Sequence, residues 1–406
     1  MISRRSVLAG AMATLSTPLL ARRLTGRPRP GTPSTLTIHL ENKTGSDTVY
    51  AFVTGQAIDD GNALVLLESD GKTLYYPSSP PSDGTPLAVD CAIPLNASGG
   101  AARVVTIPYL AGARLWFSLG SPITFLLNPG PGLVEPSVTN PSDPNIDLQW
   151  DFCEFTYNST QMYADISMVD FVCLPIALSL SVTGGAAQRV RGLPAGGVDK
   201  VCTALKAQAR ADGNPWGDLI VRSGGKNLRA LSPTNGMVYD PSLLTGYFDA
   251  YVNQVWSMYE SATLTVDTQA QWGNVTGQVS GGVLTFDGVG SFSQPASADI
   301  FDCDSGPFSP AGMSAEMLAI TPRLAAAFNR STLLIDASQP DGENPADYYA
   351  STVTNHYARI VHATTLDGLG YAFPYDDVTP DGGVNQSGLV VSGSPHVLTA
   401  TVGRIR

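Results

Sequence analysis

Short segments in which apolar and polar residues alternate fill the first part of the chain. They lie at 36–40, 49–53, 103–107 and 115–119, and turn-forming Gly, Pro, Asn and Asp residues separate them. A period of two is typical of strands that bury one face. Short strands at this spacing favour a β-sandwich or a β-barrel. The pattern continues to about Val182.

The apolar pattern changes after Thr183-Gly-Gly, where a helical period replaces the period of two. One predicted helix presents an apolar face made of Val198, Cys202, Leu205 and Ala209. A second helix is predicted around 247–259, and two short ones at 314–320 and 322–328, because Pro322 suits the first position of a helix. Strand-like segments at 262–266 and 282–286 make this block mixed α and β.

The last part of the chain has strand patterns again, at 370–378 and 395–402. We expect this tail to complete the first sheet system. The expected fold class is therefore mainly β with an α/β insertion: a β-sandwich or barrel domain of residues 35–182 plus 360–406, and a mixed α/β domain of residues 183–359. Two chain crossings between the domains predict an open groove between them.

The N-terminus has the features of an export signal. Residues 1–23 are predicted to be a signal peptide, with the charged segment Ser3-Arg-Arg near the start and an apolar run after it. Residues 24–34 form a Pro-rich linker. A Sec-type signal and a twin-arginine leader both fit this pattern. We therefore expect a secreted, extracellular protein.

Charge and cysteine usage exclude several classes of partner. The chain has 23 Lys and Arg against 35 Asp and Glu, a net charge of −12, and no basic cluster follows the leader. This argues against nucleic acid and anionic membranes as partners. The five cysteines are an odd number, so at least one thiol is free, and Cys153 and Cys173 are either bonded or simply packed. With no CxxC pattern and scattered histidines, we expect neither a metal site nor a cofactor.

Two acidic residues stand in apolar, strand-forming surroundings between Trp150 and Pro175. They are Glu154 and Asp170, and an ionised group in such a setting is costly unless it is paired or used. Glu154, Thr156 and Asn158 lie at i, i+2 and i+4 and share one face of a strand. Ser167 and Asp170 have opposite parity, so a turn or bulge near residue 168 is needed if both are to reach that face.

Paired carboxylates beside hydrogen-bonding side chains suit the hydrolysis of glycosidic bonds. Glu154, in the more aromatic setting, is the better candidate for the general acid, and Asp170 for the general base that activates water. Thr156, Asn158 and Ser167 would bond sugar hydroxyls, and Tyr163 would stack on a sugar ring. Acids that end strands are also common as solvated or ion-paired groups, and Asn158-Ser-Thr is a glycosylation sequon typical of an exposed loop.

The segment Asp151-Phe-Cys-Glu-Phe-Thr-Tyr-Asn, with Ile166-Ser-Met-Val-Asp-Phe-Val after it, resembles the core motif of glycoside hydrolase family 64, the endo-β-1,3-glucanases. Further matches follow in order: Gly192-Leu-Pro-Ala-Gly-Gly, Lys226-Asn-Leu-Arg-Ala-Leu-Ser-Pro, Gly246-Tyr-Phe-Asp-Ala-Tyr, Asn355-His-Tyr-Ala-Arg and Tyr371-Ala-Phe-Pro-Tyr-Asp-Asp-Val. Together they span essentially residues 36–402.

The resemblance implies a thaumatin-like β-domain joined to a mixed α/β domain, with a wide groove for β-1,3-glucan. It implies cleavage with inversion, with pentaose as the typical product, by a monomer acting on laminarin, curdlan or fungal cell wall. The family's acid and base fall on Glu154 and Asp170, and its sugar-contacting Thr and Asn on Thr156 and Asn158. Tyr163 and Ser167 stand where relatives often have Trp and Thr, and both substitutions keep the chemical type, so the resemblance implies a difference in subsite affinity rather than in activity.

Two further acids and the tryptophans have alternative interpretations. Asp376 and Asp377 resemble the acidic groove lining of thaumatin-like folds, although turn-forming acids explain them equally well. For the five tryptophans, core packing is favoured over sugar stacking. A different class of function also remains open: a thaumatin-like protein that binds β-1,3-glucan without cleaving it.

Overall fold

The computed structural model of the chain describes residues 32–404, and these fall into two compact units. The first unit holds the described residues up to 167, together with 173–197 and those from 388 onward. The second unit holds residues 168–172 and 198–387. The predicted signal peptide, 1–23, and most of the predicted linker, 24–34, lie outside the described residues.

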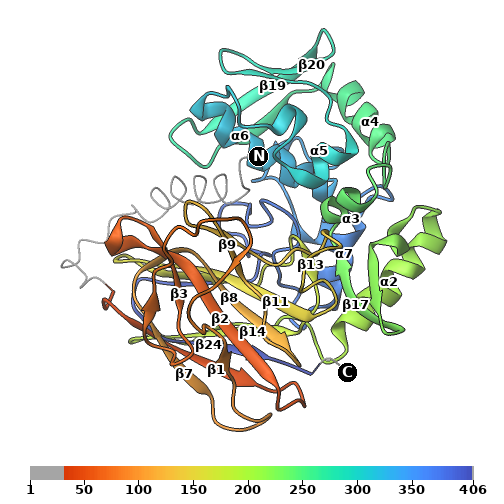
Figure 1. Cartoon of the computed structure of the whole chain (residues 1–406). Helices are drawn as coiled ribbons and strands as arrows, with labels where there is room; N and C mark the ends of the chain where they lie inside the picture. Colours follow the sequence, from red (N-terminus) through yellow and green to blue (C-terminus); the bar gives the residue numbers. More distant parts are fainter. Residues whose placement is uncertain (1–31, 405–406) are drawn as a thin grey trace. The chain divides into compact units, whose positions relative to one another are not determined.

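Two large sheets build the first unit, and strands of both are labelled in Figure 1. The five-stranded sheet runs in the order β15 (Gln188–Val190), β14 (Ile176–Val182), β24 (Pro395–Val402), β1 (Leu36–Asn42) and β7 (Arg103–Ile107). The main path of the eight-stranded sheet is β23 (Leu389–Ser392), β12 (Met162–Asp165), β11 (Gln149–Tyr157), β8 (Leu110–Leu119), β2 (Val49–Ala57), β3 (Ala63–Leu67) and β4 (Leu74–Tyr75), and β6 (Ile93–Pro94) pairs with β2. A small third sheet joins β10 (Gly132–Val134), β9 (Leu126–Asn128) and β5 (Thr85–Pro86).

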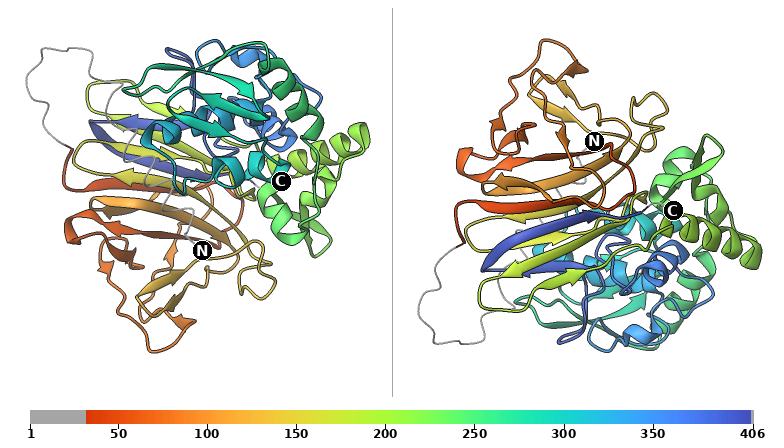
Figure 2. Two further views of the ribbon diagram at one scale, coloured as in Figure 1. Left: turned by 90° about the horizontal axis from the view of Figure 1, so that it is seen from above. Right: turned by 90° about the horizontal axis from the view of Figure 1, so that it is seen from below.

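The alternating pattern that predicted these strands is the pattern of their burial. Along β1, the residues Leu36, Ile38 and Leu40 are buried and those between them are only partly covered. Apolar residues at every second position therefore bind β1 to the core by one face. The predicted return of the tail is confirmed for 395–402, since β24 pairs with β1 in parallel and with β14 antiparallel. Figure 2 shows this C-terminal strand, in blue, beside strands from the first half of the chain.

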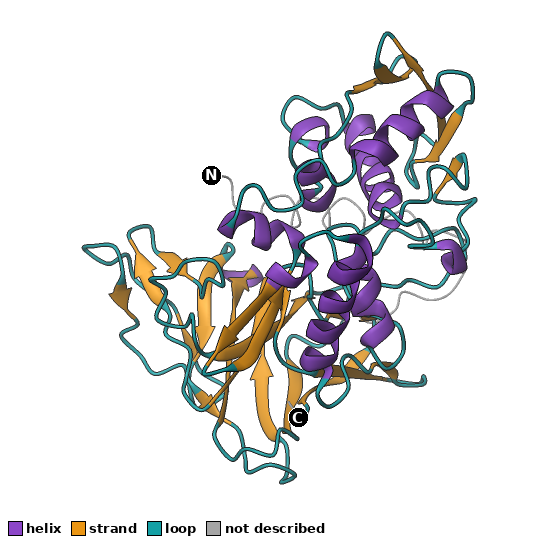
Figure 3. Ribbon diagram, turned by 90° about the vertical axis from the view of Figure 1, so that its right-hand side faces the viewer, coloured by secondary structure: helices purple, strands orange, loops and turns teal. Residues whose placement is uncertain are grey.

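The α-helices found within residues 32–404 lie in the second unit, apart from Gly197 at the start of the first of them, and Figure 3 shows them in purple. The helices are α2 (Gly197–Asp212), α3 (Pro233–Tyr239), α4 (Asp249–Tyr259), α5 (Ser297–Asp302), α6 (Ala315–Arg330) and α7 (His356–Thr364). Its three-stranded sheet runs in the order β13 (Phe171–Val172), β17 (Lys226–Leu231) and β16 (Ile220–Ser223). Its five-stranded sheet runs in the order β21 (Gly290–Phe292), β20 (Val283–Phe286), β19 (Asn274–Ser280), β18 (Leu264–Asp267) and β22 (Ser338–Gln339). The helices predicted from 198–209 and 247–259 are confirmed as α2 and α4. The fold is mainly β, with several sheets and few helices.

The boundaries between the units differ from the predicted ones. Residues 183–197 belong to the first unit because β15 extends its five-stranded sheet. Residues 360–387 belong to the second unit. The predicted strand at 370–378 is wrong: the segment forms turns, with Tyr375 at a φ of 70°, and its backbone bends around a buried carboxylate described below.

The two short helices predicted around Pro322 are a single helix, α6, with Ser314 as its N-cap. A proline inside a helix removes one backbone donor and normally bends or ends it. Side-chain donors serve neighbouring carbonyls here: the Thr321 hydroxyl donates to Met317 O at 3.0 Å, and Arg323 Nη1 donates to Ala319 O at 3.1 Å. Almost all of the helix after residue 319 is buried, so tertiary packing outweighs the local signal.

None of the five cysteines forms a disulfide bond, and all are buried, which resolves the choice for Cys153 and Cys173 in favour of packing. Of the tryptophans, Trp116, Trp150, Trp216 and Trp256 are buried, as predicted, and Trp272 is partly exposed. Between residues 32 and 404, no helix combines the length and the apolar character that a membrane crossing requires.

Candidate active site

Strand β11 presents Glu154 and Thr156 on one half-exposed face, while Cys153, Phe155 and Tyr157 are buried on the other. The predicted parity of this strand is therefore confirmed. At the end of the strand, the apolar residues at 153, 155 and 157 hold it against the core and leave 154 and 156 for polar side chains, whereas Trp150 and Phe152, earlier on the face of Glu154, are buried. Asn158 follows directly after the strand and is also half-exposed.

Sheet register places charged groups beside Glu154 on both neighbouring strands. Glu154 lies opposite Arg114 of β8 and opposite Asp165 of β12. Two residues further along, Thr156 lies opposite Tyr163. Because directly opposed residues point to the same side of a sheet, these side chains form a polar row across three strands. The row brings together three residues that the sequence assigned to the site: Glu154, Thr156 and Tyr163.

Arg114 holds the carboxylate of Glu154 in an ion pair. Its Nε donates to Glu154 Oε1 at 2.8 Å, and its Nη1 donates to Glu135 Oε2 at 3.0 Å. The side chains of Arg114 and Glu135 are each 17% exposed and that of Glu154 is 26% exposed. The guanidinium carbon of Arg114 lies 4.3 Å from the centre of the Phe152 ring, within the range of a cation–π contact. Glu154 is thus fixed in place and still reachable by solvent.

Neither Arg114 nor Glu135 was identified from the sequence. Arg114 is a lone charge in the strand Leu110–Leu119, where Ala113 and Leu115 on either side are buried. That isolation was the available signal, since a charge in a buried strand needs a partner. Glu135 follows β10 and gave no comparable signal.

Asn158 uses part of its side chain to shape the turn between β11 and β12. Its Oδ1 accepts hydrogen bonds from the backbone N–H of Thr160 at 2.9 Å and of Gln161 at 3.0 Å. This is the turn chemistry typical of asparagine. Any contact of Asn158 with a sugar would therefore come from its amide nitrogen.

The chain leaves the sheet after Asp165 and bends before β13, as the parity of Ser167 and Asp170 required. Ser167 is only 5% exposed, which leaves little of its surface for a sugar. The bend at 169–170 is in the second unit, and Asp170 is partly exposed there.

Asp170 is positioned by the start of α3. Its backbone carbonyl accepts hydrogen bonds from the N–H of Ser232 at 2.9 Å and from Asn235 Nδ2 at 2.9 Å. The same Asn235 amide lies 3.3 Å from Asp170 Oδ1. Ser232 is the N-cap of α3, with Pro233 in the first turn. The first turn of α3 therefore fixes both the backbone and the carboxyl of Asp170.

Asp376 has a structural role, which contradicts its assignment as a substrate-binding residue. It is 0% exposed, and its oxygens accept from Arg330 Nη2 at 3.2 Å, His362 Nε2 at 2.9 Å and the N–H of Ala372 at 3.0 Å. A carboxylate enclosed and bonded in this way presents no surface to a glucan. The turn-forming alternative explains this residue.

Asp377 is partly exposed and accepts a hydrogen bond from the Tyr371 hydroxyl at 3.1 Å. Burial of the carboxyl raises its pKa above the ordinary value, against the opposing effect of the Tyr371 hydrogen bond. Its assignment to substrate binding stays a prediction.

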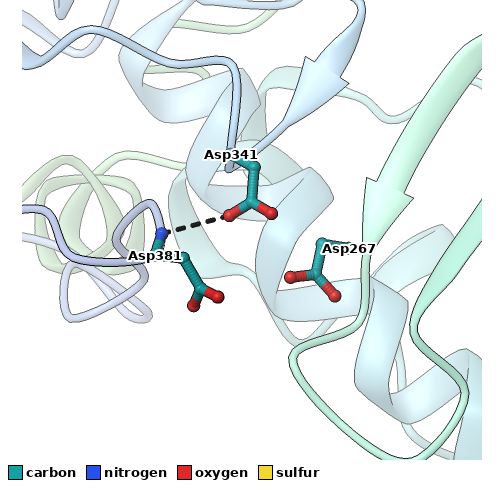
Figure 4. A group of neighbouring side chains, drawn as sticks. All are labelled: Asp267, Asp341 and Asp381. Atoms are coloured by element: carbon teal, nitrogen blue, oxygen red, sulfur yellow. Dashed lines mark hydrogen bonds between the residues drawn. The ribbon is translucent and has the colours of Figure 1, made fainter.

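A third group of acids lies in the second unit, where Asp267, Asp341 and Asp381 approach one another (Figure 4). One carboxylate oxygen of each lies within 4.8 Å of the others, and the N–H of Asp381 donates to Asp341 Oδ1 at 3.1 Å. Burial raises the pKa of Asp267, and the charges of Asp341 and Asp381 raise it further. The sequence did not predict this cluster, because its members are far apart in the chain.

Residues 34–402 match the model of glycoside hydrolase family 64, described as beta-1,3-glucanase. A glucan endo-1,3-beta-glucosidase of Cellulosimicrobium cellulans is 28% identical over 379 residues. That match covers 91% of this chain and 65% of the relative, so the chain spans only about two thirds of that protein's length.

The chain is also similar to solved structures of β-1,3-glucanases. A laminaripentaose-producing β-1,3-glucanase, crystallised in complex with laminaritetraose, is 33% identical with a TM-score of 0.82, and the match covers 92% of this chain and 100% of that one. A β-1,3-glucanase domain of family 64 from Clostridium beijerinckii is 22% identical with a TM-score of 0.71, over 93% of this chain and 100% of that one. The second likeness concerns the fold alone.

Proposed function

The chain belongs to glycoside hydrolase family 64, and on this basis we propose that it is an endo-β-1,3-glucanase that hydrolyses β-1,3-glucan with inversion. The likeness that carries the proposal is to the laminaripentaose-producing enzyme in complex with laminaritetraose, at 33% identity over all of that chain. We further propose that the protein is secreted, that its first unit is of the thaumatin-like type, and that laminaripentaose is its main product.

In the proposed reaction, Glu154 gives its proton to the oxygen of the leaving sugar as the bond from that oxygen to C1 breaks. Asp170 takes a proton from a water molecule, whose oxygen bonds to C1 from the opposite face. The side chains of Glu154 and Asp170 are both partly exposed, so that substrate and water can reach them. No metal or cofactor takes part in this scheme.

Laminarin hydrolysis by two conservative variants tests the two roles. Glu154→Gln and Asp170→Asn should each lower kcat by about 100-fold or more, because general acid–base groups contribute on that scale. Asp59→Asn, which changes an exposed acid elsewhere in the first unit, is the matched control and should keep its activity. Near-normal hydrolysis by either site variant would refute the role of that residue.

The acid and the base are told apart by the leaving group. An aryl laminari-oligosaccharide with an acidic phenol leaves without protonation, so Glu154→Gln should regain much of its rate on that substrate and Asp170→Asn should not. NMR of the first product should show the α-anomer, and a β-anomer would indicate retention. Binding of laminarin without release of oligosaccharides by the unmodified protein would instead support a glucan-binding function.

A further inference from the structure

One arginine in the first unit serves two carboxylates. Arg114 donates from Nε to Glu154 at 2.8 Å and from Nη1 to Glu135 at 3.0 Å. All three side chains are more than seven-tenths covered. Ion pairs that are partly withdrawn from water are less screened than surface pairs, so this arrangement constrains its members more strongly than an exposed bridge would.

The guanidinium of Arg114 is itself held by aromatic rings. Its central carbon lies 4.3 Å from the ring centre of Phe152 and 5.3 Å from that of Trp116. Trp116 is completely buried and donates from Nε1 to the Thr54 hydroxyl at 3.0 Å. The arginine therefore rests on a rigid base, and its direction is set by the strands rather than by the carboxylates.

We propose that Arg114 is a positioning residue for the catalytic carboxyl of Glu154, and that Glu135 offsets the charge of Arg114 so that Glu154 can carry the proton it must deliver. This inference rests on the proposed function, in which Glu154 is the general acid. It gives a role to two residues outside the paired-carboxylate motif.

Charge balance explains why a second carboxylate is needed. An arginine bonded to one carboxylate alone favours the ionised form of that group. A general acid has to be protonated before it acts, so such a pair would oppose catalysis. With Glu135 on the same guanidinium, one positive charge faces two negative ones, and protonation of Glu154 still leaves Arg114 paired.

The other acidic residues near Glu154 do not offset the charge of Arg114 as Glu135 does. Asp165, opposite Glu154 on β12, is 3% exposed and lies on the strand away from Arg114. Asp151, on the other face of β11, has its Oδ2 engaged by the N–H groups of Cys173 and Leu174 at 2.8 and 2.9 Å. Glu135, in contrast, binds the same guanidinium as Glu154.

The pH dependence of kcat tests the role of Glu135. In Glu135→Gln the charge of Arg114 acts on Glu154 alone, so the alkaline limb of the profile should move to lower pH by about half to one unit. Glu135→Asp keeps the charge and should stay close to the unmodified profile. Glu260→Gln, an exposed acid of the second unit, is the matched control and should not move it. A Glu135→Gln profile that superimposes on the unmodified one overturns the inference.

Positioning by Arg114 is tested at the pH optimum. Lysine keeps the charge but lacks the fork that reaches two carboxylates, so Arg114→Lys should lower kcat by about 10- to 100-fold while KM changes less than about threefold. Arg189→Lys, an exposed arginine on β15, should leave both constants unchanged. If Glu135→Gln does not fold, this measurement decides alone, and a kcat of Arg114→Lys within twofold of the unmodified value refutes the proposal.

Glu154→Gln separates this inference from the proposed function. If Glu154→Gln hydrolyses laminarin normally, the catalytic role of Glu154 is wrong and the inference falls with it. If Glu154→Gln is inactive while Glu135→Gln and Arg114→Lys behave like the unmodified protein, only the inference is wrong.

Discussion

His362 and Asp376 form an ion pair inside the second unit, with His362 Nε2 at 2.9 Å from Asp376 Oδ2. The other ring nitrogen of His362 lies 2.9 Å from the carbonyl oxygen of Gly368. Asp376 also pairs with Arg330 at 3.2 Å, and Arg330 lies 3.6 Å from Glu343. Asp376 and Arg330 are completely enclosed, so this network organises the turns of residues 368–378 around one carboxylate.

The pair should make stability depend on pH in two directions. Burial lowers the pKa of His362, but the charge and hydrogen bond of Asp376 outweigh it and the net shift is upward from 6.5. Burial raises the pKa of Asp376, but His362 and Arg330 outweigh it and the net shift is downward from 3.8. The stability that His362 contributes to the fold is complete below pH 6.5 and is lost as the pH rises through the raised pKa of His362. The stability that Asp376 contributes to the fold is complete above pH 3.8 and is lost as the pH falls through the lowered pKa of Asp376.

Urea unfolding at pH 5 and at pH 9 measures the upper side of this window. The free energy of unfolding should be lower at pH 9 than at pH 5. In His362→Gln this decrease should be smaller, because the part that comes from the ion pair is absent. An equal fall in the variant and in the unmodified protein would contradict the ion pair.

The three acids of Figure 4 should lower stability at neutral pH. Burial, together with Asp341 and Asp381, raises the pKa of Asp267. A raised carboxyl pKa favours folding below the ordinary value of 3.8, and this advantage is lost as pH rises through the folded value. Asp267→Asn should therefore raise the thermal midpoint at pH 7 relative to the unmodified protein, and by less at pH 4. A lower midpoint for Asp267→Asn at pH 7 would show that the negative charge is needed.

The sequence predicted those parts of the fold where one local pattern determines the result. The strands at 36–40 and 395–402 and the helix at 198–209 each bury one regular face, so their periodicity shows in the residues. The helix around Pro322 was misjudged, since the packing of α6 outweighs the local effect of a proline. The nine-residue helix α7 was missed even though Asn355 caps it by accepting from Ala358 N–H, a helix-start signal that the sequence carries.

The candidate site could likewise be predicted only where a local pattern along one strand determines it. Parity along one strand gave the shared face of Glu154 and Thr156. Arg114 and Glu135 meet Glu154 through the pairing of separate strands, which spacing in the chain does not encode. Asp376 looked like an exposed acid because its partners, Arg330 and His362, are also brought in by tertiary structure.

Gly192, which begins one of the matched motifs, should be intolerant of any side chain. Its φ is +58°, and a Cβ added there would lie 1.9 Å from the carbonyl oxygen of Ile176. The backbone of Ile176 cannot move away as easily as the end of a flexible side chain could. Gly192→Ala should therefore lower the free energy of unfolding by about 3 kcal/mol or more. Gly184→Ala is the matched control, with φ +74° and open space around the added carbon, and should cost only about 1–2 kcal/mol. Equal costs in chemical denaturation would show that the contact with Ile176 is relieved at little expense.

Tyr163 should affect the binding of glucan more than its cleavage. It lies opposite Thr156 and is partly exposed on the face that carries Glu154. An aromatic ring contributes about 0.5–1.5 kcal/mol through stacking, so Tyr163→Ala should raise KM for laminari-oligosaccharides by about 2- to 10-fold with a smaller change in kcat. Tyr163→Phe keeps the ring and should restore most of the affinity. Tyr239→Ala removes an exposed tyrosine, 48% accessible at the end of α3, and is the control for a general loss of aromatic surface. A KM for Tyr163→Ala that equals that of Tyr239→Ala would mean that the Tyr163 ring does not bind sugar.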